Sequence, residues 1–558
     1  MAMLGFAYAH PNLRTARNAN LAVFPATQAA MTKDAGRGHA LLVGAGILCS
    51  RLFGLVRQRV FAHFFGLSDA ADIFSAALRV PNFLQNLFGE GVLSASFIPV
   101  YARLLAQHKQ EEADRLAGAI FAILALIISV IVALGILATP YLLWLIAPGY
   151  TGEKRALTIL IVRILFPGTG ILVWSAWCLG ILNSHHKFFL SYAAPVIWNL
   201  SMILSMLIFH HLDANRLIVY LAWGTVLGCL LQFLVQLGPV LKLVPNLRLR
   251  LDMQSLHVKQ VGGSFLGVAV GRGVVQISAF VDQAISTLLG SGAVAGMTTA
   301  ASINLLPVSL FGMAVSASEL PTLSRMAGEH VDEEVAAKLS ARLNNGLERI
   351  AFFIVPSAMA FFALGNVIVA ALYQTGAFTA KDAYYVWAIL AGSGVGLLAS
   401  TFGRLYSSTY YAMRDTRTPL RYALVRLAFT VALGLASALS MPKLLGIPMQ
   451  WGAVGLTASA GVAGWIEFHL LRRKMNRKLG RTGVAVSMMV KLWMAAAVAA
   501  LVACAVERVM PAWGPIVTAA FVLSTYGIAY FLVTFLLHVR TCREIVQQVM
   551  RRIGVGRP

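Results

Sequence analysis

Residues 50–103 read SRLFGLVRQRVFAHFFGLSDAADIFSAALRVPNFLQNLFGEGVLSASFIPVYAR. Most of this stretch is apolar enough to lie inside a bilayer, yet it contains ionisable side chains at Arg51, Arg57, Arg59, His63, Asp72, Arg79 and Glu90. Charged groups at membrane depth are costly, so they usually face the interior of a helix bundle or a water-filled cavity and mark a transport path. Because arginine outnumbers the acidic residues here, the stretch predicts a cavity that receives an anion.

The polar residues between positions 72 and 90 share one face of the predicted helix. At about 100° per residue they fall within an arc roughly 80° wide. The residues on this arc are Asp72, Ser75, Arg79, Asn82, Asn86 and Glu90. The pattern predicts a polar stripe along one side of a membrane helix. The alternative interpretation is a set of structural ion pairs that neutralise one another.

The composition of the whole chain agrees with a membrane protein. Of its 558 residues, 58% are hydrophobic and 12% are charged, and the mean hydropathy is +0.75. A soluble protein of this length would need far more charged surface, so we expect an all-α polytopic membrane protein. The net charge of +23 would suggest a nucleic-acid partner for a soluble protein. Here the basic residues lie mostly in short connections between apolar segments, so no nucleic-acid binding is expected.

Apolar segments long enough to cross a bilayer recur along the chain and predict about fourteen helices. They lie near residues 40–65, 72–100, 117–147, 156–182, 188–209, 216–241, 260–289, 293–320, 350–373, 383–411, 420–441, 450–471, 486–506 and 514–538.

Lysine and arginine concentrate in alternate connections between these segments. The basic connections carry Arg103, Lys109 and Arg115; Lys187; Lys242, Arg248, Arg250 and Lys259; Arg325, Lys338, Arg342 and Arg349; Arg414, Arg417 and Arg421; Arg472, Arg473, Lys474, Arg477, Lys478 and Arg481; and Arg540, Arg543, Arg551 and Arg552. By the positive-inside rule, this pattern predicts that both termini are cytoplasmic. The chief exceptions in the other connections are Lys154, Arg155, Lys381 and Lys443.

A short motif occurs twice, after the second and after the eighth predicted span. Residues 94–103 and 316–325 both read SASxxPxxxR, and each is preceded by Leu-Phe-Gly. A second pair follows at similar separation, Tyr-Thr-Gly at 150–152 and Tyr-Gln-Thr-Gly at 373–376. These echoes indicate a duplication with a unit of about six spans. An even number of spans gives both copies the same orientation, with the substrate site between two lobes.

The repeat suggests a division of the chain into lobes and tails. We expect a cytoplasmic tail over residues 1–39, an N-lobe of spans 1–6 over 40–245 and a C-lobe of spans 7–12 over 258–471. Two accessory spans follow over 485–540, and a cytoplasmic tail over 541–558. The predicted fold is therefore two pseudo-symmetric six-helix lobes around a central cavity, plus two extra C-terminal helices.

No enzyme, metal or cofactor motif was found. The chain has no Walker-type phosphate loop, and its five cysteines show no paired spacing. The glycine-rich run at 392–396 lies inside a span, where close helix packing is the better interpretation. In the second half, Arg272 and Asp282 lie within the seventh span. For Arg272, a role in function and pairing with Asp282 remain equally open.

Several motifs resemble the MurJ (MviN) family of lipid II flippases. The most specific block comprises SRLFGLVR at 50–57, Asp72, RVPNFL at 79–84, FGEG at 88–91 and FIP at 97–99. The resemblance continues through GRGV at 271–274 with Asp282, YQTGAFT at 373–379 and YAMRDTRTP at 411–419. It covers nearly the whole chain beyond the N-terminal tail.

The resemblance implies a fold of the multidrug/oligosaccharidyl-lipid/polysaccharide (MOP) exporter type. It also implies a bacterial plasma-membrane transporter that flips lipid II, the undecaprenyl-pyrophosphate-linked peptidoglycan precursor, by alternating access. Arginines can hold a pyrophosphate through charge-assisted contacts, and the family's functional arginines and first-lobe acids correspond to Arg51, Arg57, Asp72 and Glu90. Together with Arg59, Arg79 and Arg272, these are the candidate substrate-binding residues, and Asp282 is a candidate coupling or structural charge. Lipid II, membrane lipids and cell-wall synthases are the expected partners.

The chain departs from the family pattern at three positions. Many members have an arginine pair where this chain has Gln85 and Asn86, and an arginine in the eighth span where it has Ser302. We therefore expect Arg272 to supply the second lobe's positive charge. Export of another polyprenyl-linked oligosaccharide and a non-transporting scaffold for cell-wall assembly are the alternative functions.

Overall fold

The computed structural model describes residues 46, 48–327, 332–511 and 513–553. For residues 80, 81, 90, 266–279, 317, 321, 327 and 548–553 the description covers the backbone alone. The predicted N-terminal tail, 1–39, lies outside the described residues, as does the end of the C-terminal tail. Within the described ranges all regular structure is helical, apart from one isolated β-bridge between Thr375 and Phe378.

The first half of the described chain forms a series of long helices with short connections. It begins with a helix at residues 48–65. The helices that follow are α2 (Asp69–Phe88), α3 (Glu90–Ser96), α4 (Ile98–Ala106), α5 (Gln110–Ile146), α6 (Gly152–Ser184), α7 (Phe188–Ala193), α8 (Pro195–Ile208) and α9 (Ala214–Leu243).

The second half continues in the same way from α10 to the C-terminus. Its helices are α10 (Leu256–Thr287), α11 (Ala293–Pro307), α12 (Ala314–Ala327), α13 (Glu333–Ala363), α14 (Gly365–Tyr373), α15 (Ala380–Ala412), α16 (Arg417–Leu435), α17 (Met441–Leu445), α18 (Gly452–Leu479), α19 (Val486–Val509), α20 (Pro515–Leu536) and α21 (Arg540–Ile553). Short π-helices join α11 to α12 and α16 to α17, and a 3-10 turn precedes α18.

The described residues include 11 helices long and apolar enough to cross a membrane. The remaining predicted spans coincide with the helix at 48–65, with α2–α4 and with α10. The expected all-α polytopic membrane fold is therefore confirmed.

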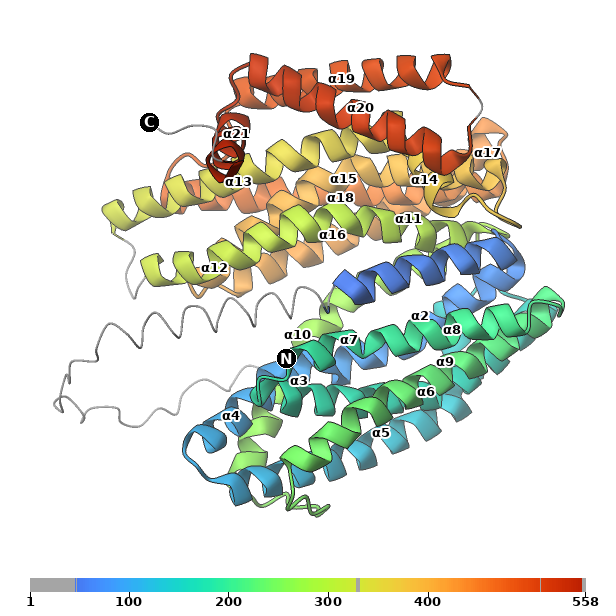
Figure 1. The fold of residues 1–558 in the computed structure, drawn as a ribbon, viewed down its shortest axis with the longest axis vertical. Coiled ribbons are helices and arrows are strands. Elements are labelled where there is room, and N and C mark those ends of the chain that lie inside the picture. The colour runs from blue at the N-terminus through green and yellow to red at the C-terminus, as the bar shows by residue number, and fades with distance from the viewer. Residues whose placement is uncertain (1–45, 47, 328–331, 512, 554–558) are drawn as a thin grey trace, which may run out of the picture.

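The helices form two packed bodies, with α10 in contact with both. Figure 1 shows α2–α9 in one body and α11–α18 in the other, while α19 and α20 lie on the outer side of the second. There α19 packs on α13 and α20 on α14. The buried apolar residues likewise separate into one large cluster in the second half and two main clusters in the first.

Consecutive long helices run in opposite directions, so the connections gather at two ends. We call the end that carries connections 107–109, 185–187, 244–255, 413–416 and 480–485 the basic end. The opposite end carries connections 66–68, 147–151, 209–213, 288–292 and 374–379. In Figure 1 the basic end lies to the left and the opposite end to the right.

Both copies of the Leu-Phe-Gly motif fall where a helix is irregular. In the first copy Gly89 separates α2 from α3, and its backbone is not helical. In the second copy residues 310–312 lie inside the π-helix Val308–Met313. Extra or missing helical bonds at such points bend a membrane helix. The duplicated motif therefore interrupts equivalent helices of the two halves.

The glycine-rich run at 392–396 serves close helix packing, as its sequence indicates. It lies on α15, which packs along α18. A Cβ added at Gly396 would stand 2.4 Å from the Cα of Gly461 on α18. Small residues at such crossings let two membrane helices approach closely.

We predict that Gly396→Leu destabilises the protein by about 1–3 kcal/mol, because the added side chain must force α15 and α18 apart. Thermal unfolding of the detergent-purified protein measures the effect. Gly527→Leu is the matched control, because a Cβ at Gly527 in α20 has nothing within 4 Å. Equal losses in the two variants would contradict the packing role.

Candidate functional site

A polar cavity of about 470 Å³ lies between the helix at 48–65, α2, α8 and α11. The first half of the chain supplies its lining residues except for Thr298, which comes from α11 in the second half. Its lining residues are Arg57, Gln58, Phe61, Phe74, Ser75, Leu78, Arg79, Asn82, Gln85, Asn86, Trp198, Met202 and Thr298. The cavity thus combines two guanidinium groups, several amides and an aromatic wall.

Arg57 lies against α8 in the cavity. Its guanidinium carbon is 5.2 Å from the centre of the Trp198 ring, and Nη1 is 3.8 Å from the sulfur of Met202. Trp198 and Met202 are four residues apart, so they share one face of α8. The ring face attracts the cation, but no carboxylate of the described residues forms an ion pair with it. Arg57 therefore keeps its positive charge available to a ligand.

Arg79, in contrast, lies in the field of an acidic residue from α10. Asp282 interacts electrostatically with Arg79 and with Arg426 of α16. Arg426 in turn donates to Glu467 of α18 at 3.2 Å. The Oδ1 atom of Asp282 is buried and has no hydrogen-bond partner among the described residues. Helix α10 itself runs without interruption from Leu256 to Thr287.

The predicted polar stripe is split between two places. Ser75, Arg79, Asn82 and Asn86 line the cavity. Asp72 lies about one turn nearer the opposite end and is not part of the cavity lining. The side chain of Glu90 lies outside the described residues.

Asp72 joins the two halves of the molecule at the opposite end. Its fully buried carboxylate accepts hydrogen bonds from the backbone N–H groups of Gly292 and Ala295, at 2.8 and 2.9 Å. These groups form the N-terminus of α11, where free N–H donors and the helix dipole favour an anion. Gly292 has a φ of 81°, and an added Cβ would stand 2.8 Å from the carbonyl oxygen of Leu67. Glycine therefore permits this close approach.

Arg59 makes the complementary contact at the C-terminus of α14. Its Nη1 donates to the carbonyl oxygens of Ala371 and Leu372 at 2.6 and 2.8 Å. The C-terminal end of a helix favours a cation for the same reason that the N-terminal end favours an anion. One turn further along the first helix, the carbonyl of His63 accepts from Ala377 N at 2.8 Å. We call these contacts, with those of Asp72, the seam.

Lys154 completes the seam and was not recognised as a site residue in the sequence. Its ammonium group lies 2.6 Å from Asp69 and 3.0 Å from Asp72. Lys154 could have been recognised in the sequence because it is one of the few basic residues near connections that are otherwise poor in lysine and arginine. A lysine in the first turn of α6, beside an otherwise lysine-poor connection, is explained by the two carboxylates with which it pairs.

Two further predicted site residues are Arg51 and Arg272. Arg51 is exposed and about 9 Å nearer the basic end than Arg57, from six residues of helix. The Arg272 side chain lies outside the described residues. Ser302 on α11 lies with its Oγ 3.0 Å from the hydroxyl of Tyr373. Trp198, Met202 and Thr298 line the cavity but were not found from the sequence.

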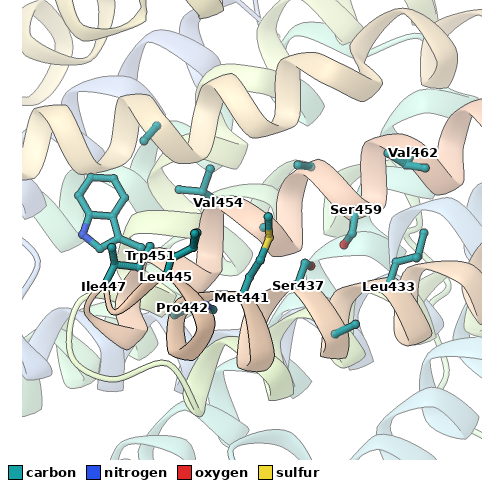
Figure 2. Close-up of a pocket in the computed structure, with 14 residues that line it drawn as sticks. Leu433, Ser437, Met441, Pro442, Leu445, Ile447, Trp451, Val454, Ser459 and Val462 are labelled. Atoms are coloured by element: carbon teal, nitrogen blue, oxygen red, sulfur yellow. The ribbon is translucent and has the colours of Figure 1, made fainter.

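A second, apolar groove of about 680 Å³ lies between α16–α17 and α18, towards the opposite end. Figure 2 shows side chains of the two helices facing each other, with Leu433 and Met441 on one side, Val454 and Val462 on the other, and Trp451 at one end. No charged residue lines it. A pyrophosphate would find no cationic partner among these lining residues, so the polar cavity is the candidate site for an anion.

Comparisons with known proteins agree with this arrangement. The sequence model of a family described as "Lipid II flippase MurJ" matches residues 61–529. The chain belongs to the MurJ family. A probable lipid II flippase MurJ of Rhizobium tropici is 32% identical over 433 residues, covering 76% of this chain and 78% of the relative. The lipid II flippase MurJ of Burkholderia cenocepacia is 31% identical over 441 residues, covering 78% and 82%.

Solved structures confirm the MOP-type fold. A lipid II flippase MurJ in an inward closed conformation superposes with a TM-score of 0.72 at 22% identity, covering 89% of this chain and 99% of the other. An inward-facing multidrug transporter of the MATE family gives a TM-score of 0.63 at 19% identity, covering 77% and 95%. MurJ proteins are membrane transporters and not enzymes, as expected from the sequence.

We predict that Asp72→Asn loosens the seam without unfolding the protein. Asparagine keeps the volume but loses the charge that Lys154 and the α11 N-terminus stabilise, which is worth about 1.5–3 kcal/mol. A cysteine introduced at the buried Val294 should then react roughly tenfold to a hundredfold faster with a polar maleimide.

The measurement uses detergent-purified protein carrying Cys49→Ser, because Cys49 is exposed. Asp213→Asn is the matched control: Asp213 also caps a helix at the opposite end, but its acceptor contact is to Arg216 N within α9. Unchanged labelling in the Asp72 variant would show that the seam does not depend on this carboxylate.

Proposed function

We propose that the protein flips lipid II from the cytoplasmic to the outer leaflet of a bacterial plasma membrane by alternating access, for cell-wall synthesis. Family membership and the names of the relatives as lipid II flippases support this choice of substrate. The basic end faces the cytoplasm in this proposal, by the positive-inside rule, so that both termini are cytoplasmic. Cell-wall synthases remain candidate partners.

The observation that carries the proposal is Arg57, a half-buried guanidinium that pairs with no carboxylate of the described residues and lines a polar cavity bordered by α11 of the second half. Such a charge is costly at membrane depth unless an anion joins it. A pyrophosphate offers several oxygens to a planar guanidinium fork. The amides of Gln58, Asn82 and Gln85 can donate to sugar or peptide groups of the same ligand.

In the proposed transport cycle, the seam closes the protein at the opposite end. Asp72 and Arg59 hold helix termini of the second half against the first half at the opposite end. In the proposal the cavity opens toward the basic end while these contacts persist, and the seam breaks when the transporter turns outward. The polyprenyl tail remains in the apolar membrane phase beside the protein.

The cavity departs from the family pattern in a way that limits its positive charge. Gln85 and Asn86 line it in place of an arginine pair, and Ser302 stands beside Tyr373 in place of another arginine. We propose that Arg272, near the middle of α10, supplies the second half's charge. Arg51 then supports capture near the entrance, because it is exposed and closer to the basic end.

We predict that Arg57→Gln abolishes rescue of a bacterium depleted of its own flippase while the protein remains at normal abundance in the membrane. Losing one charge-assisted contact should weaken capture of the pyrophosphate roughly tenfold to a hundredfold. Arg51→Ala should also abolish rescue at normal abundance. Complementation and immunoblots of membrane fractions measure the two quantities.

The matched control for Arg57 is Arg155→Gln. Arg155 also lies over a tryptophan, with its guanidinium carbon 4.9 Å from the Trp144 ring centre, but it is not part of the cavity lining. This control should retain rescue. If Arg57→Gln instead removes the protein from the membrane, Arg57 is structural and the proposed role fails.

We predict that Arg272→Gln weakens lipid II binding, whereas Asp282→Asn leaves it largely intact. The second change removes a negative charge whose partners are Arg79 and Arg426, so it exposes positive charge to the ligand. Binding of lipid II to each purified variant, followed by microscale thermophoresis, tests the assignment. If both variants lose binding and the double variant recovers it, the two residues form a structural pair.

A reconstituted assay distinguishes the proposed function from its alternatives. Liposomes containing the protein are supplied with lipid II or with another polyprenyl-linked oligosaccharide, and exposure of the headgroup on the outer surface is followed. Selective movement of lipid II supports the flippase. Movement of the other lipid alone favours a different exporter, and movement of neither favours a scaffold.

A further inference from the structure

The basic end carries a pocket that belongs to neither the polar cavity nor the apolar groove. It has a volume of about 580 Å³ and lies between α16 and α18. Its lining residues are Tyr422, Leu470, Arg473, Lys474, Arg477 and Lys478. The basic residues come from one stretch of α18 at helical spacing, so they project from neighbouring faces of that helix.

Two of the cations in this pocket already have partners. Lys474 donates to the hydroxyl of Thr418 at 2.7 Å, and Lys478 to the carboxylate of Asp415 at 3.0 Å. Burial alone would raise the pKa of Asp415, but hydrogen bonds from Lys478 and Thr418 outweigh it and lower this pKa to about 2. Asp415 is therefore ionised at physiological pH and neutralises Lys478.

Arg473 and Arg477 are exposed, and no carboxylate of the described residues forms an ion pair with either. Elsewhere at the basic end, Lys338 pairs with Glu334 and Arg540 with Glu544, within their own helices. The two free guanidinium groups lie one turn apart on α18, with Cβ atoms about 5–6 Å from each other. That spacing lets both forks reach the oxygens of one phosphate group.

The pocket lies at the depth of lipid headgroups. Helix α18 has 28 residues, which correspond to about 42 Å, whereas the hydrocarbon core is about 30 Å thick. Its last turns, from Arg473 onward, therefore extend past the acyl chains at the basic end. On α16, Leu420 and Leu424 are 48% and 50% exposed, as expected for a surface that faces lipid.

We propose that this pocket binds the phosphate headgroup of an anionic phospholipid in the leaflet at the basic end. Arg473 and Arg477 hold the phosphate, Lys474 and Lys478 add positive charge around it, and Tyr422 and Leu470 contact the glycerol and first acyl carbons. Basic pockets between membrane helices are suited to such headgroups. The site is distinct from the transported substrate's cavity, which is built from other helices.

The test measures thermal stabilisation of detergent-purified full-length protein by added lipid. Phosphatidylglycerol should raise the unfolding midpoint, whereas phosphatidylcholine and inorganic phosphate at the same concentrations should not. In Arg473→Gln/Arg477→Gln, the phosphatidylglycerol concentration giving half the shift should rise at least about tenfold. The matched control, Arg248→Gln/Arg250→Gln, removes two exposed arginines of another connection at the same end and should respond like the natural protein.

Three results would overturn the proposal. They are an unchanged response of the Arg473/Arg477 double variant, an equal loss in the control pair, and a full shift from inorganic phosphate alone, which would indicate a free-anion site. The unfolding midpoint without lipid shows whether the double variant is folded. If it is not, the single variants Arg473→Gln and Arg477→Gln replace it, and each should lose part of the response.

Discussion

The arrangement of the two halves depends on one buried carboxylate. Asp72 receives hydrogen bonds from two backbone N–H groups at the N-terminus of α11 and from Lys154, and it is fully buried. A buried charge is stable only when such donors compensate its desolvation. If the two halves separate at this end, Asp72 loses both α11 donors together. The seam is therefore expected to be either closed or open, without stable intermediate separations.

The seam uses the charges of helix termini instead of ion pairs between side chains of the two halves. Asp72 meets a helix N-terminus and Arg59 meets a helix C-terminus, so each contact has the sign that the dipole favours. Both contacts come from the first half and both termini belong to the second. A contact to a helix terminus needs no matching side chain on the partner, and it can release without leaving an unpaired charge on the other body.

The cavity and the seam differ in how their charges are compensated. At the seam Lys154 forms ion pairs with both Asp69 and Asp72. In the cavity Arg57 lies beside a tryptophan ring and a methionine sulfur, and no carboxylate of the described residues forms an ion pair with it. Arg79 has Asp282 nearby. The uncompensated positive charge of the cavity is therefore concentrated at Arg57. An incoming anion would form its most favourable electrostatic interaction there.

The sequence predicted the fold and part of the site. Long apolar runs predict membrane helices because the bilayer leaves few alternatives, and the helical wheel correctly grouped Asn82 and Asn86 with Arg79 in the cavity. It could not separate Asp72 from that group, because its partner Gly292 lies 220 residues away along the chain. Trp198 and Met202 were not predicted as lining residues either. In the sequence of an apolar span, an aromatic or sulfur-containing side chain that contacts a cation cannot be told from one that faces lipid.

Lys154 links topology to mechanism. A lysine in the first turn of α6, at the opposite end, runs against the charge pattern from which the orientation of the chain is predicted. Its contacts with Asp69 and Asp72 remove most of that conflict, because the local group carries two negative charges against one positive. The same residues therefore bear on both membrane topology and closure of the seam. The two carboxylates offset the positive charge of Lys154 at this end, and Lys154 offsets the cost of burying the Asp72 carboxylate. Neither charge is explained without the other.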